Sequence, residues 1–163
     1  MRAESERTAA MLRDLKRAGL KMTPQRIAIV QLFAEDDSHP TAQDLFERLR
    51  PAFPSMSFAT VYNTLDALAK AGLAGIVRLP GKRGDAARFD PRTGPHHHAV
   101  CDACGAVLDI TAGTLSPTPG AVKKLRRAAP GFDVRAVERI YRGLCADCAR
   151  DRQQSTSHAR RHT

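Results

Sequence analysis

Apolar residues in 6–71 recur every three or four positions, which is the spacing of amphipathic helices. The clearest case is 58–71, where Val61, Leu65 and Leu68 share one face and polar residues occupy the other. We predict helices at 6–18, from Pro24 to the acidic run at 35–37, from Thr41 to the prolines after 50, and at 58–71. The inward-facing residues predicted for the first three are Met11, Leu12, Leu15, Ala18, Ile27, Val30, Leu32 or Phe33, Leu45 and Leu49.

Three of these helices follow a residue that can cap them. Thr23, Thr41 and Ser57 each offer a side-chain oxygen to a backbone N–H of the first turn. Pro24 suits the first helical position, where no backbone N–H is needed, and Gly19 is expected to end the first helix. The pattern therefore predicts several short helices in close succession.

A predicted β-hairpin follows the helices. The apolar run 73–79 and the run 86–89 flank the basic turn Gly81-Lys82-Arg83-Gly84-Asp85. Helices followed by a basic hairpin indicate a winged helix-turn-helix, with 57–71 as the recognition helix and 73–89 as the wing. An ordinary packing helix is the alternative interpretation of 57–71, because helix-turn-helix geometry is weakly encoded in sequence.

The second half of the chain has a different pattern. Residues 90–95 are rich in Pro and Gly and are typical of a hinge. Beyond them we predict two paired strands at 99–101 and 106–110, a short basic helix at 121–129 and a third strand at 132–141. The predicted fold class is α+β, with a small α/β domain after the winged-helix domain.

The net charge of +9 suggests a polyanionic partner such as nucleic acid. Residues 1–90 carry 14 Lys and Arg against 11 Asp and Glu, and residues 91–163 carry 12 against 6, so charge alone locates a DNA surface poorly. No run of about 18 apolar residues occurs, so we expect no membrane association. The N-terminus lacks the apolar stretch of a signal peptide, and we expect a cytoplasmic protein.

The four cysteines form two CxxC pairs separated by 40 residues. Disulfides are the default in secreted proteins, whereas this pattern more often binds metal in cytosolic ones. Thiolates are soft ligands that suit zinc in a closed tetrahedral site. We predict a structural Zn²⁺, which would stabilise a domain with little core, bound by Cys101, Cys104, Cys145 and Cys148.

A histidine run and nearby carboxylates supply ligands of a second kind, which suit harder ions such as iron or manganese. On a strand, His96 and His98 would point to one side and His97 to the other. A run of histidines is often a solvated surface, and we expect His97 to face solvent or to be a minor ligand. From the residues alone, we do not include His39 among the candidate metal ligands, because a single histidine is usually a cap or a core residue.

Several segments resemble the ferric uptake regulator family and, within it, most closely the PerR peroxide-stress repressors. They are Met-Thr-Pro-Gln-Arg (22–26), His-Pro-Thr-Ala (39–42), Ser-Phe-Ala-Thr-Val-Tyr-Asn-Thr-Leu (57–65), Arg-Phe-Asp (88–90) and His-His-His-Ala-Val-Cys-Asp-Ala-Cys-Gly (96–105). The resemblance covers about residues 8–150 in colinear order. It implies a homodimeric repressor, not an enzyme, with a winged-helix DNA-binding domain at 1–90, a hinge at 91–95, a dimerisation and metal-binding domain at 96–150 and a disordered basic tail at 151–163.

The resemblance also implies a regulatory Fe²⁺ or Mn²⁺ site beside the structural Zn²⁺. Its ligands would be His39, Asp90, His96, His98 and Asp109. Aspartate, the residue at position 109, is the residue type that the peroxide sensors carry there, whereas iron-responsive relatives tend to carry glutamate. Segment 133–139 offers no histidine for a further site, although one using His97 and Glu138 stays open. One ion bound by both domains would fix the angle between them and hence the spacing of two recognition helices.

Peroxide sensing is a further implication of the resemblance. Ferrous iron with nitrogen and oxygen ligands reduces hydrogen peroxide, and the oxidant formed attacks a coordinating imidazole, here His39 or His96. The damaged ring binds metal poorly, so repression of oxidative-stress and metal-homeostasis genes would end. Manganese in the same site would hold the domains together without this reaction.

On DNA, the resemblance assigns Tyr62 and Asn63 to the major groove and Lys21 to the minor groove of an A·T-rich palindromic operator. Asparagine can read adenine through two hydrogen bonds. Further candidates at the interface, mostly for phosphate contacts, are Ser57, Thr60, Thr64, Arg78, Lys82 and Arg83. For Tyr62 the alternative is a half-buried aromatic residue of the helix.

Two other interpretations remain open. The first is an iron, manganese or zinc uptake regulator of the same family without peroxide sensing. The absence of a sensing cysteine disfavours zinc, although the order of metal affinities favours zinc over iron. The second is an enzyme, because histidines and carboxylates on iron could make a non-haem oxygenase or a hydrolase. That interpretation needs a substrate pocket and open coordination positions.

Overall fold

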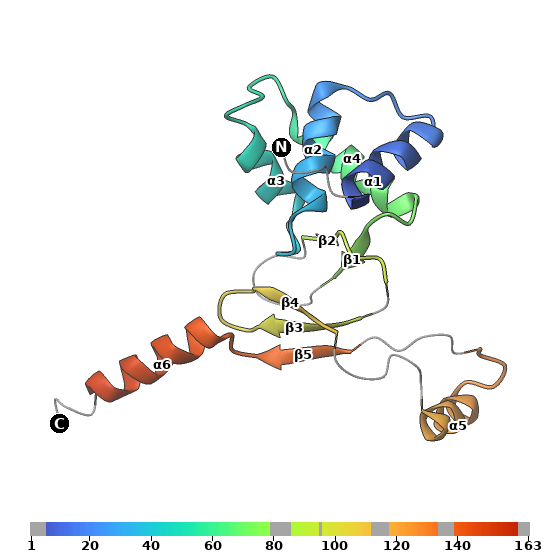
Figure 1. Ribbon diagram of the computed structural model, residues 1–163. Helices are drawn as coiled ribbons and strands as arrows, with labels where there is room; N and C mark the ends of the chain where they lie inside the picture. The colour runs from blue at the N-terminus through green and yellow to red at the C-terminus, as the bar shows by residue number, and fades with distance from the viewer. Residues whose placement is uncertain (1–5, 79–85, 95, 112–117, 134–138, 160–163) are drawn as a thin grey trace. The chain divides into compact units, whose positions relative to one another are not determined.

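The computed structural model describes residues 6–78, 86–94, 96–111, 118–133 and 139–159 (Figure 1). The chain divides into two compact units, Met1–Thr93 (unit 1) and Gly94–Thr163 (unit 2), and this division lies inside the segment 91–95. Helices and sheets are both present, which confirms the predicted α+β class. Among the described residues, no helix combines the length and the apolar character needed to cross a membrane.

The helices of unit 1 lie close to the predicted positions. They are α1 (Glu6–Arg17), α2 (Pro24–Ala34), α3 (Ala42–Leu49) and α4 (Phe58–Lys70). Gly19, which follows α1, has a φ of 81°, and glycine adopts this left-handed conformation without steric strain. The three predicted caps are confirmed, because Thr23, Thr41 and Ser57 each accept the backbone N–H three residues further on, at 3.2, 3.1 and 3.1 Å.

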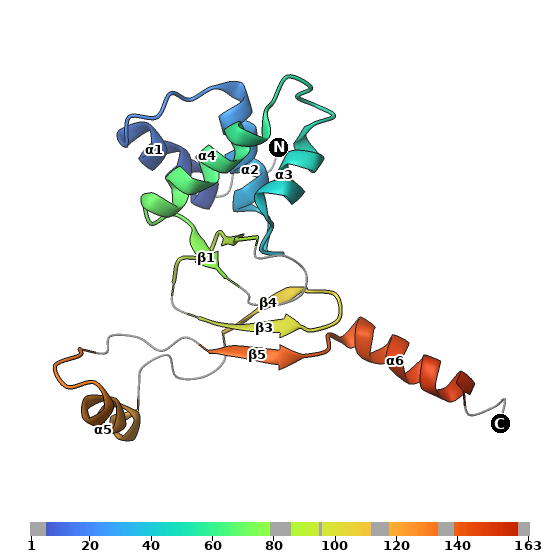
Figure 2. The ribbon, with the colours of Figure 1, turned by 180° about the vertical axis from the view of Figure 1, so that it is seen from behind.

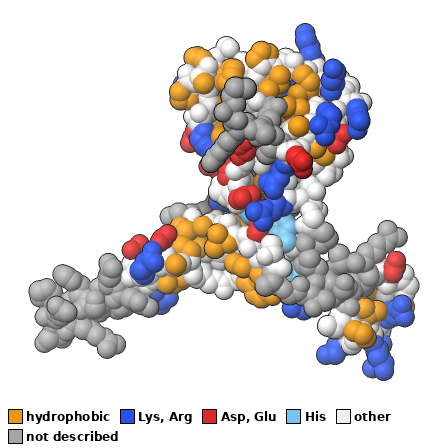
Figure 3. Space-filling model, viewed as in Figure 1, with side chains coloured by type: hydrophobic (Ala, Val, Ile, Leu, Met, Phe, Trp, Pro, Cys, Tyr) orange, Lys and Arg blue, Asp and Glu red, His pale blue; other side chains and the backbone are white. Residues whose placement is uncertain are grey.

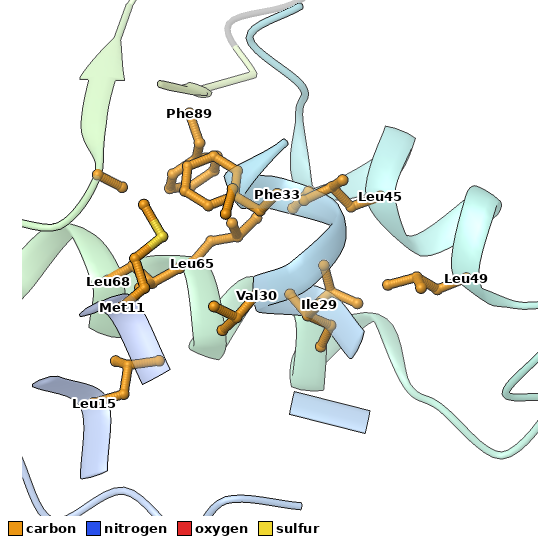
Figure 4. Close-up of a cluster of buried hydrophobic side chains, with 14 of the residues drawn as sticks. Met11, Leu15, Ile29, Val30, Phe33, Leu45, Leu49, Leu65, Leu68 and Phe89 are labelled. Carbon is orange, nitrogen blue, oxygen red and sulfur yellow. The ribbon is translucent and has the colours of Figure 1, made fainter. Parts of the chain in front are cut away.

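The hydrophobic core of unit 1 joins all four helices to a strand (Figure 4). Figure 4 draws side chains from each of these elements, including Met11, Leu15, Ile29, Val30, Phe33, Leu45, Leu49, Leu65, Leu68 and Phe89. Each such burial stabilises the fold by about 1.5–3 kcal/mol relative to an exposed side chain. The core therefore fixes the helices and the strand as one body.

Two predictions about unit 1 are wrong. Ile29 rather than Ile27 is the buried isoleucine of α2, because Ile29, Val30 and Phe33 share the covered side of this largely apolar helix. Thr64, a candidate phosphate contact and therefore expected to be accessible, is fully buried. Its hydroxyl donates to the carbonyl oxygen of Thr60 at 2.7 Å, which satisfies the polar group inside the core.

A two-stranded hairpin follows α4. Strands β1 (Gly75–Val77) and β2 (Arg88–Asp90) are antiparallel, and Gly75 pairs with Asp90. A Cβ at Gly75 would lie 3.3 Å from the Cβ of Asp90, so glycine leaves room for that side chain. Helices followed by this hairpin form the predicted winged helix-turn-helix. The turn between the strands, with Lys82 and Arg83, lies outside the described residues.

Unit 2 contains a three-stranded sheet in the order β4-β3-β5 (Figure 2). Strand β3 (His97–Cys101) pairs antiparallel with β4 (Val107–Ile110) and parallel with β5 (Ile140–Gly143). Helix α5 (Pro119–Ala128) confirms the predicted basic helix, and Figure 3 shows Lys and Arg side chains gathered over it. A last helix, α6, spans Ala146–Ala159.

Two predictions about unit 2 differ from the structure. The third strand begins at Ile140 rather than at 132, and residues 134–138 lie outside the described part of the chain. The segment 151–163 was expected to be a disordered tail, but α6 continues to Ala159. No Pro or Gly interrupts 146–159, and its Ala, Arg and Gln residues favour a helix. Residues 160–163 are not described.

Candidate metal centres

The parallel pairing of β3 with β5 brings the two CxxC motifs together. Cys101 ends β3 and pairs with Gly143 of β5, and Cys145 follows two residues later. The backbone N–H of Asp102 donates to the carbonyl of Gly143 at 2.7 Å, which extends this pairing into the first CxxC turn. Cys148 lies in the first turn of α6. All four cysteines thus meet at the same end of the sheet.

The four sulfur atoms lie close enough together to bind one zinc ion. They all lie within 4.8 Å of one another, and the Sγ atoms of Cys104 and Cys145 are 3.8 Å apart. Zn–S bonds of about 2.3 Å in a tetrahedron place the sulfurs roughly 3.8 Å apart. All four cysteines are free rather than joined in disulfides. The cluster could therefore hold zinc through four thiolates, with no coordination position left for catalysis.

The thiols of this cluster differ in acidity. Backbone N–H groups of Cys104 and Cys145 donate to the sulfur of Cys101 and lower the pKa of this thiol to about 6. Hydrogen bonds with the sulfurs of Cys145 and Cys104 raise the pKa of Cys148 to about 12. Zinc is bound by thiolates, so the Cys101 thiol is the more easily prepared ligand of the two and the Cys148 thiol the harder one to deprotonate.

A second group of ligands lies on β3 and β4 of unit 2. His98 stands opposite Asp109 in the β3–β4 pairing, and His96 lies two residues earlier on the same side. The Nε2 atoms of the two imidazoles are 2.9 Å apart, and they lie 3.3 and 3.9 Å from Oδ1 of Asp109. Two imidazole nitrogens and one carboxylate oxygen that converge in this way fit a first-row divalent ion.

The backbone fixes the orientation of one of these rings. Nδ1 of His96 lies 2.7 Å from the carbonyl oxygen of Gly94, which can only accept a hydrogen bond. A proton on Nδ1 satisfies this contact, and Nε2 would then be the ring nitrogen that coordinates an ion bound between His98 and Asp109. We refer to His96, His98 and Asp109 as the unit 2 half-site.

A third group of ligands lies within unit 1. Nε2 of His39 is 3.7 Å from Oδ2 of Asp90, and both side chains are buried. The other carboxylate oxygen of Asp90 accepts the backbone N–H of Arg92 at 2.7 Å, which orients Oδ2 toward the imidazole. We refer to His39 and Asp90 as the unit 1 half-site, and its donors are again nitrogen and oxygen.

His97 points away from the unit 2 half-site, as strand alternation predicts. The expectation that it faces solvent is wrong, because its side chain is buried. Its ring packs edge-on against Tyr141 of β5, with centroids 6.1 Å apart. Strand β5 comes from a distant part of the sequence, so alternation along β3 predicts the side on which His97 lies but not what covers it.

The candidate DNA contacts lie in different environments. Lys21, Tyr62 and Asn63 are exposed, so they are available to a partner. The hydroxyl oxygens of Ser57 and Thr60 are 2.9 Å apart and share a hydrogen bond at the start of α4. The buried side chain of Thr64 is not accessible to phosphate, which corrects its assignment. Arg78 is exposed, whereas Lys82 and Arg83 lie outside the described residues.

Two arginines that contact the unit 1 half-site were not singled out by the sequence. Arg88 donates to the carbonyl oxygen of His39 at 3.1 Å. Arg92, whose N–H binds Asp90, also pairs through its guanidinium with Asp37 at 3.2 Å. Arg88 forms part of the Arg-Phe-Asp motif, but nothing in the motif itself indicates a contact with a residue 49 positions earlier.

A sequence model of the ferric uptake regulator family matches residues 17–128. The chain is 36% identical over 140 residues to the peroxide operon regulator of Bacillus subtilis strain 168, a match that covers 85% of this chain and 91% of the relative. It is 35% identical over 153 residues to the peroxide-responsive repressor PerR of Staphylococcus saprophyticus, with 91% and 98% covered.

A solved structure also has a similar fold. The structure of a zinc uptake regulator complexed with zinc and DNA matches with a TM-score of 0.61 at 25% identity, and the match covers 94% of this chain and 99% of that one. The family match includes all of α2–α4, the hairpin, β3, β4 and α5. From the sequence match and the nearly full-length relatives together, the chain belongs to the ferric uptake regulator family.

Proposed function

We propose that this chain is a metal-dependent transcriptional repressor that responds to hydrogen peroxide. The observation that carries the proposal is the convergence of His96, His98 and Asp109, a set of nitrogen and oxygen donors without a thiol. Two relatives at 36% and 35% identity, both named for peroxide responses, support it. The chain would then be a regulator rather than an enzyme, and it would act in the cytoplasm where the chromosome lies.

Two metals are assigned in this proposal. Zn²⁺ is the structural ion of the four-cysteine cluster, because four sulfur donors within 4.8 Å of one another suit it. Fe²⁺ or Mn²⁺ is the regulatory ion, because imidazole and carboxylate donors suit harder metals. Each half-site alone leaves coordination positions unfilled, so we propose that one ion uses both. Its ligands are then His39, Asp90, His96, His98 and Asp109.

The regulatory ligands belong to different units of the chain. Unit 1 supplies two and unit 2 supplies three, and the division between the units lies inside the proposed hinge 91–95. We propose that 1–90 binds DNA and that 96–150 forms a homodimer. The unit 1 half-site and the unit 2 half-site would bind the ion together only in the conformation that is competent to bind DNA. The ion then shifts the equilibrium by its greater affinity for that form. In a symmetric dimer, the ion-bound conformation would set the distance between the two α4 helices, which must match the distance between the two halves of the operator palindrome.

The proposed DNA interface is the exposed side of α4. Tyr62 and Asn63 would contact base edges in the major groove of an A·T-rich palindrome, and Lys21 would contact the minor groove. Ser57 and Thr60, at the start of α4, are the proposed phosphate contacts together with the wing residues Lys82 and Arg83. The net charge of +9 supports a polyanionic partner.

Release of DNA would follow from damage to a ligand. When bound, Fe²⁺ would activate hydrogen peroxide next to the ligand side chains, and the two electrons that reduce the peroxide would come in net terms from the imidazole that is oxidised. The proposed target is His39 or His96, where one oxygen atom of the peroxide is added to a ring carbon and the other leaves as water. The oxidised imidazole binds metal poorly, so the two half-sites no longer share the ion and the dimer releases its operator.

Mass spectrometry of the Fe²⁺-loaded protein after brief peroxide exposure tests the proposal. We expect the mass of one added oxygen atom on peptides with His39 or His96, together with release of an A·T-rich palindromic duplex. The Mn²⁺-loaded protein is the matched control and should show neither. Substituting alanine at His39, His96 and Asp109 together should abolish metal-dependent DNA binding. A triple variant that still binds the duplex as the parent does, with or without metal, contradicts the proposal.

A metal-uptake regulator without peroxide sensing is the second candidate. It is favoured by the likeness to a zinc uptake regulator bound to zinc and DNA. In that case only withdrawal of the metal releases the operator, and peroxide leaves the histidine peptides unmodified. The experiment above therefore distinguishes the two candidates.

A further inference from the structure

His39 has an unusual backbone conformation. Its φ is 56°, and among the described residues it is the one non-glycine residue with a positive φ. In this left-handed region the Cβ of an ordinary residue crowds its own backbone. Proline at position 40 restricts His39 further, because a residue before proline favours an extended backbone. The surrounding structure must therefore hold His39 in place.

Strand β2 supplies the contacts that hold it. The guanidinium of Arg88 donates to the carbonyl oxygen of His39 at 3.1 Å. The backbone N–H of Phe89 donates to the carbonyl oxygen of Pro40 at 3.0 Å, and Thr41 forms an isolated antiparallel bridge with Arg88. Three consecutive residues of the loop are thus tied to one short strand.

The residues before His39 are also fixed. The carboxylate of Asp36 accepts the backbone N–H of Ser38 at 2.9 Å and also pairs with Arg48 of α3. The loop is therefore anchored on both sides of His39. Of these contacts, the bond from Arg88 is the one that a side chain makes directly to His39.

We propose that Arg88 is a positioning residue for the regulatory metal, acting through His39. By holding the carbonyl of His39, it maintains the left-handed backbone that directs the imidazole toward Asp90, 3.7 Å away. Asp90 lies on the same strand two residues after Arg88, so one strand carries both the carboxylate ligand and the group that orients the histidine. This inference rests on the proposed role of His39 as a ligand.

A consequence is that contacts which involve no metal would hold the unit 1 half-site ready for the ion. Binding then needs no rearrangement of the loop 36–41, so the binding free energy of the ion is not reduced by the cost of ordering this loop. Without the Arg88 contact, the backbone of His39 can relax toward negative φ, which turns the imidazole away. The remaining ligands would be unchanged.

Manganese titration of the zinc-loaded dimer tests this inference. Arg88→Met keeps the aliphatic part of the side chain and removes its donors, and we expect the Mn²⁺ affinity to fall about tenfold or more. Arg88→Lys retains one donor and should restore part of the affinity. The d–d spectrum of Co²⁺ in the regulatory site should change in Arg88→Met in the same way as in His39→Ala. Circular dichroism and zinc content monitor folding.

A double substitution separates positioning from a general structural role. If Arg88 acts through His39, adding Arg88→Met to His39→Ala should cause no further loss of Mn²⁺ affinity. An equal loss in both backgrounds, or parental affinity in Arg88→Met, overturns the inference. If Arg88→Met does not fold, the comparison is made with Arg88→Lys, and parental affinity and an unchanged spectrum in that variant overturn it. Unchanged affinity in His39→Ala alone would instead remove His39 from the proposed site, and the inference with it.

Discussion

Asp36 is a buried carboxylate that its neighbours keep ionised. Burial by itself raises the pKa of this group, but hydrogen bonds from Ser38 and the charge and hydrogen bond of Arg48 outweigh it, so the pKa lies below its ordinary value of 3.8. These contacts also shape the loop that carries His39. At the scale of a single residue, the ionised carboxylate of Asp36 thus stabilises the structure near the candidate site, and this contribution to stability depends on pH.

We expect Asp36→Asn to destabilise unit 1 at pH 7 by about 1–3 kcal/mol, because it removes an ionised acceptor of several hydrogen bonds. The folded pKa lies below the unfolded one, so ionised Asp36 contributes stability above about pH 3.8, and this contribution is lost as the pH falls through the folded pKa. Urea unfolding at pH 7 and pH 3 measures both effects, and the variant should lose less stability than the parent on acidification.

Asp37→Asn is the matched control for this substitution. Asp37 pairs with Arg7 and Arg92, but its side chain is 58% exposed, and exposed ion pairs contribute little. An equal effect of the two substitutions would mean that burial of Asp36 does not set its contribution.

At the scale of elements, the helix caps fix where the helices of unit 1 begin. Thr23 accepts the backbone N–H of Arg26 at the start of α2, whose buried face lies in the core. Thr118 makes the same contact with Ala121 at the start of α5, a helix without buried residues. The two caps are chemically alike, but only one belongs to an element that the core depends on.

Thr23→Ala should therefore lower the free energy of unfolding of unit 1 by about 1 kcal/mol. Thr118→Ala should leave that value unchanged, since α5 belongs to unit 2 and contributes no buried side chain. Chemical denaturation followed by helical circular dichroism checks both variants. Equal losses of unit 1 stability would contradict the expected difference.

The elements that local sequence signals define were predicted well. The caps and the i, i+4, i+7 face of α4 placed that helix within a residue of its observed end, because these signals act over a few positions. Thr64 was misplaced because its hydroxyl finds a partner in its own helix, which a count of polar residues does not reveal. The start of β5 was also misplaced, since a parallel partner from far along the chain decides it.

In the candidate sites, too, features that depend on local spacing were predicted from the sequence, whereas features that depend on distant contacts were not. The two CxxC motifs and the pairing of His96 with His98 follow from spacing alone, and the distances agree with both. His39 and Asp90 lie 51 positions apart in sequence, and only resemblance to a family brought His39 into the set. The contact from Arg88 depends on a backbone conformation that no local pattern predicts for a histidine.

At the scale of the whole molecule, the two units are stabilised unequally. Among the described residues, the hydrophobic core cluster lies entirely in unit 1. The buried hydrophobic residues of unit 2 in the described part are Val100, Cys101 and Val107. Unit 2 therefore depends on its proposed zinc ion for a larger share of its folding free energy.

Removing zinc with a strong chelator should unfold unit 2 and leave unit 1 folded. Hydrogen–deuterium exchange read by mass spectrometry should show loss of protection in β3, β4 and β5, with α1–α4 still protected. Cys148→Ser should give the same pattern without chelator, and the neighbouring Ala149→Ser serves as its control. Loss of protection in both units together would show that they fold as one cooperative body.

The cluster of sulfurs has a topological consequence. With zinc bound, the 40 residues between Cys104 and Cys145 would form a ring whose two ends meet at one ion. By the chain-entropy treatment of cross-links, closing a ring of this size is worth about 4 kcal/mol. A protease cut in the exposed helix α5 would then leave two fragments that remain bound to each other through the ion. They would dissociate only when the ion is removed.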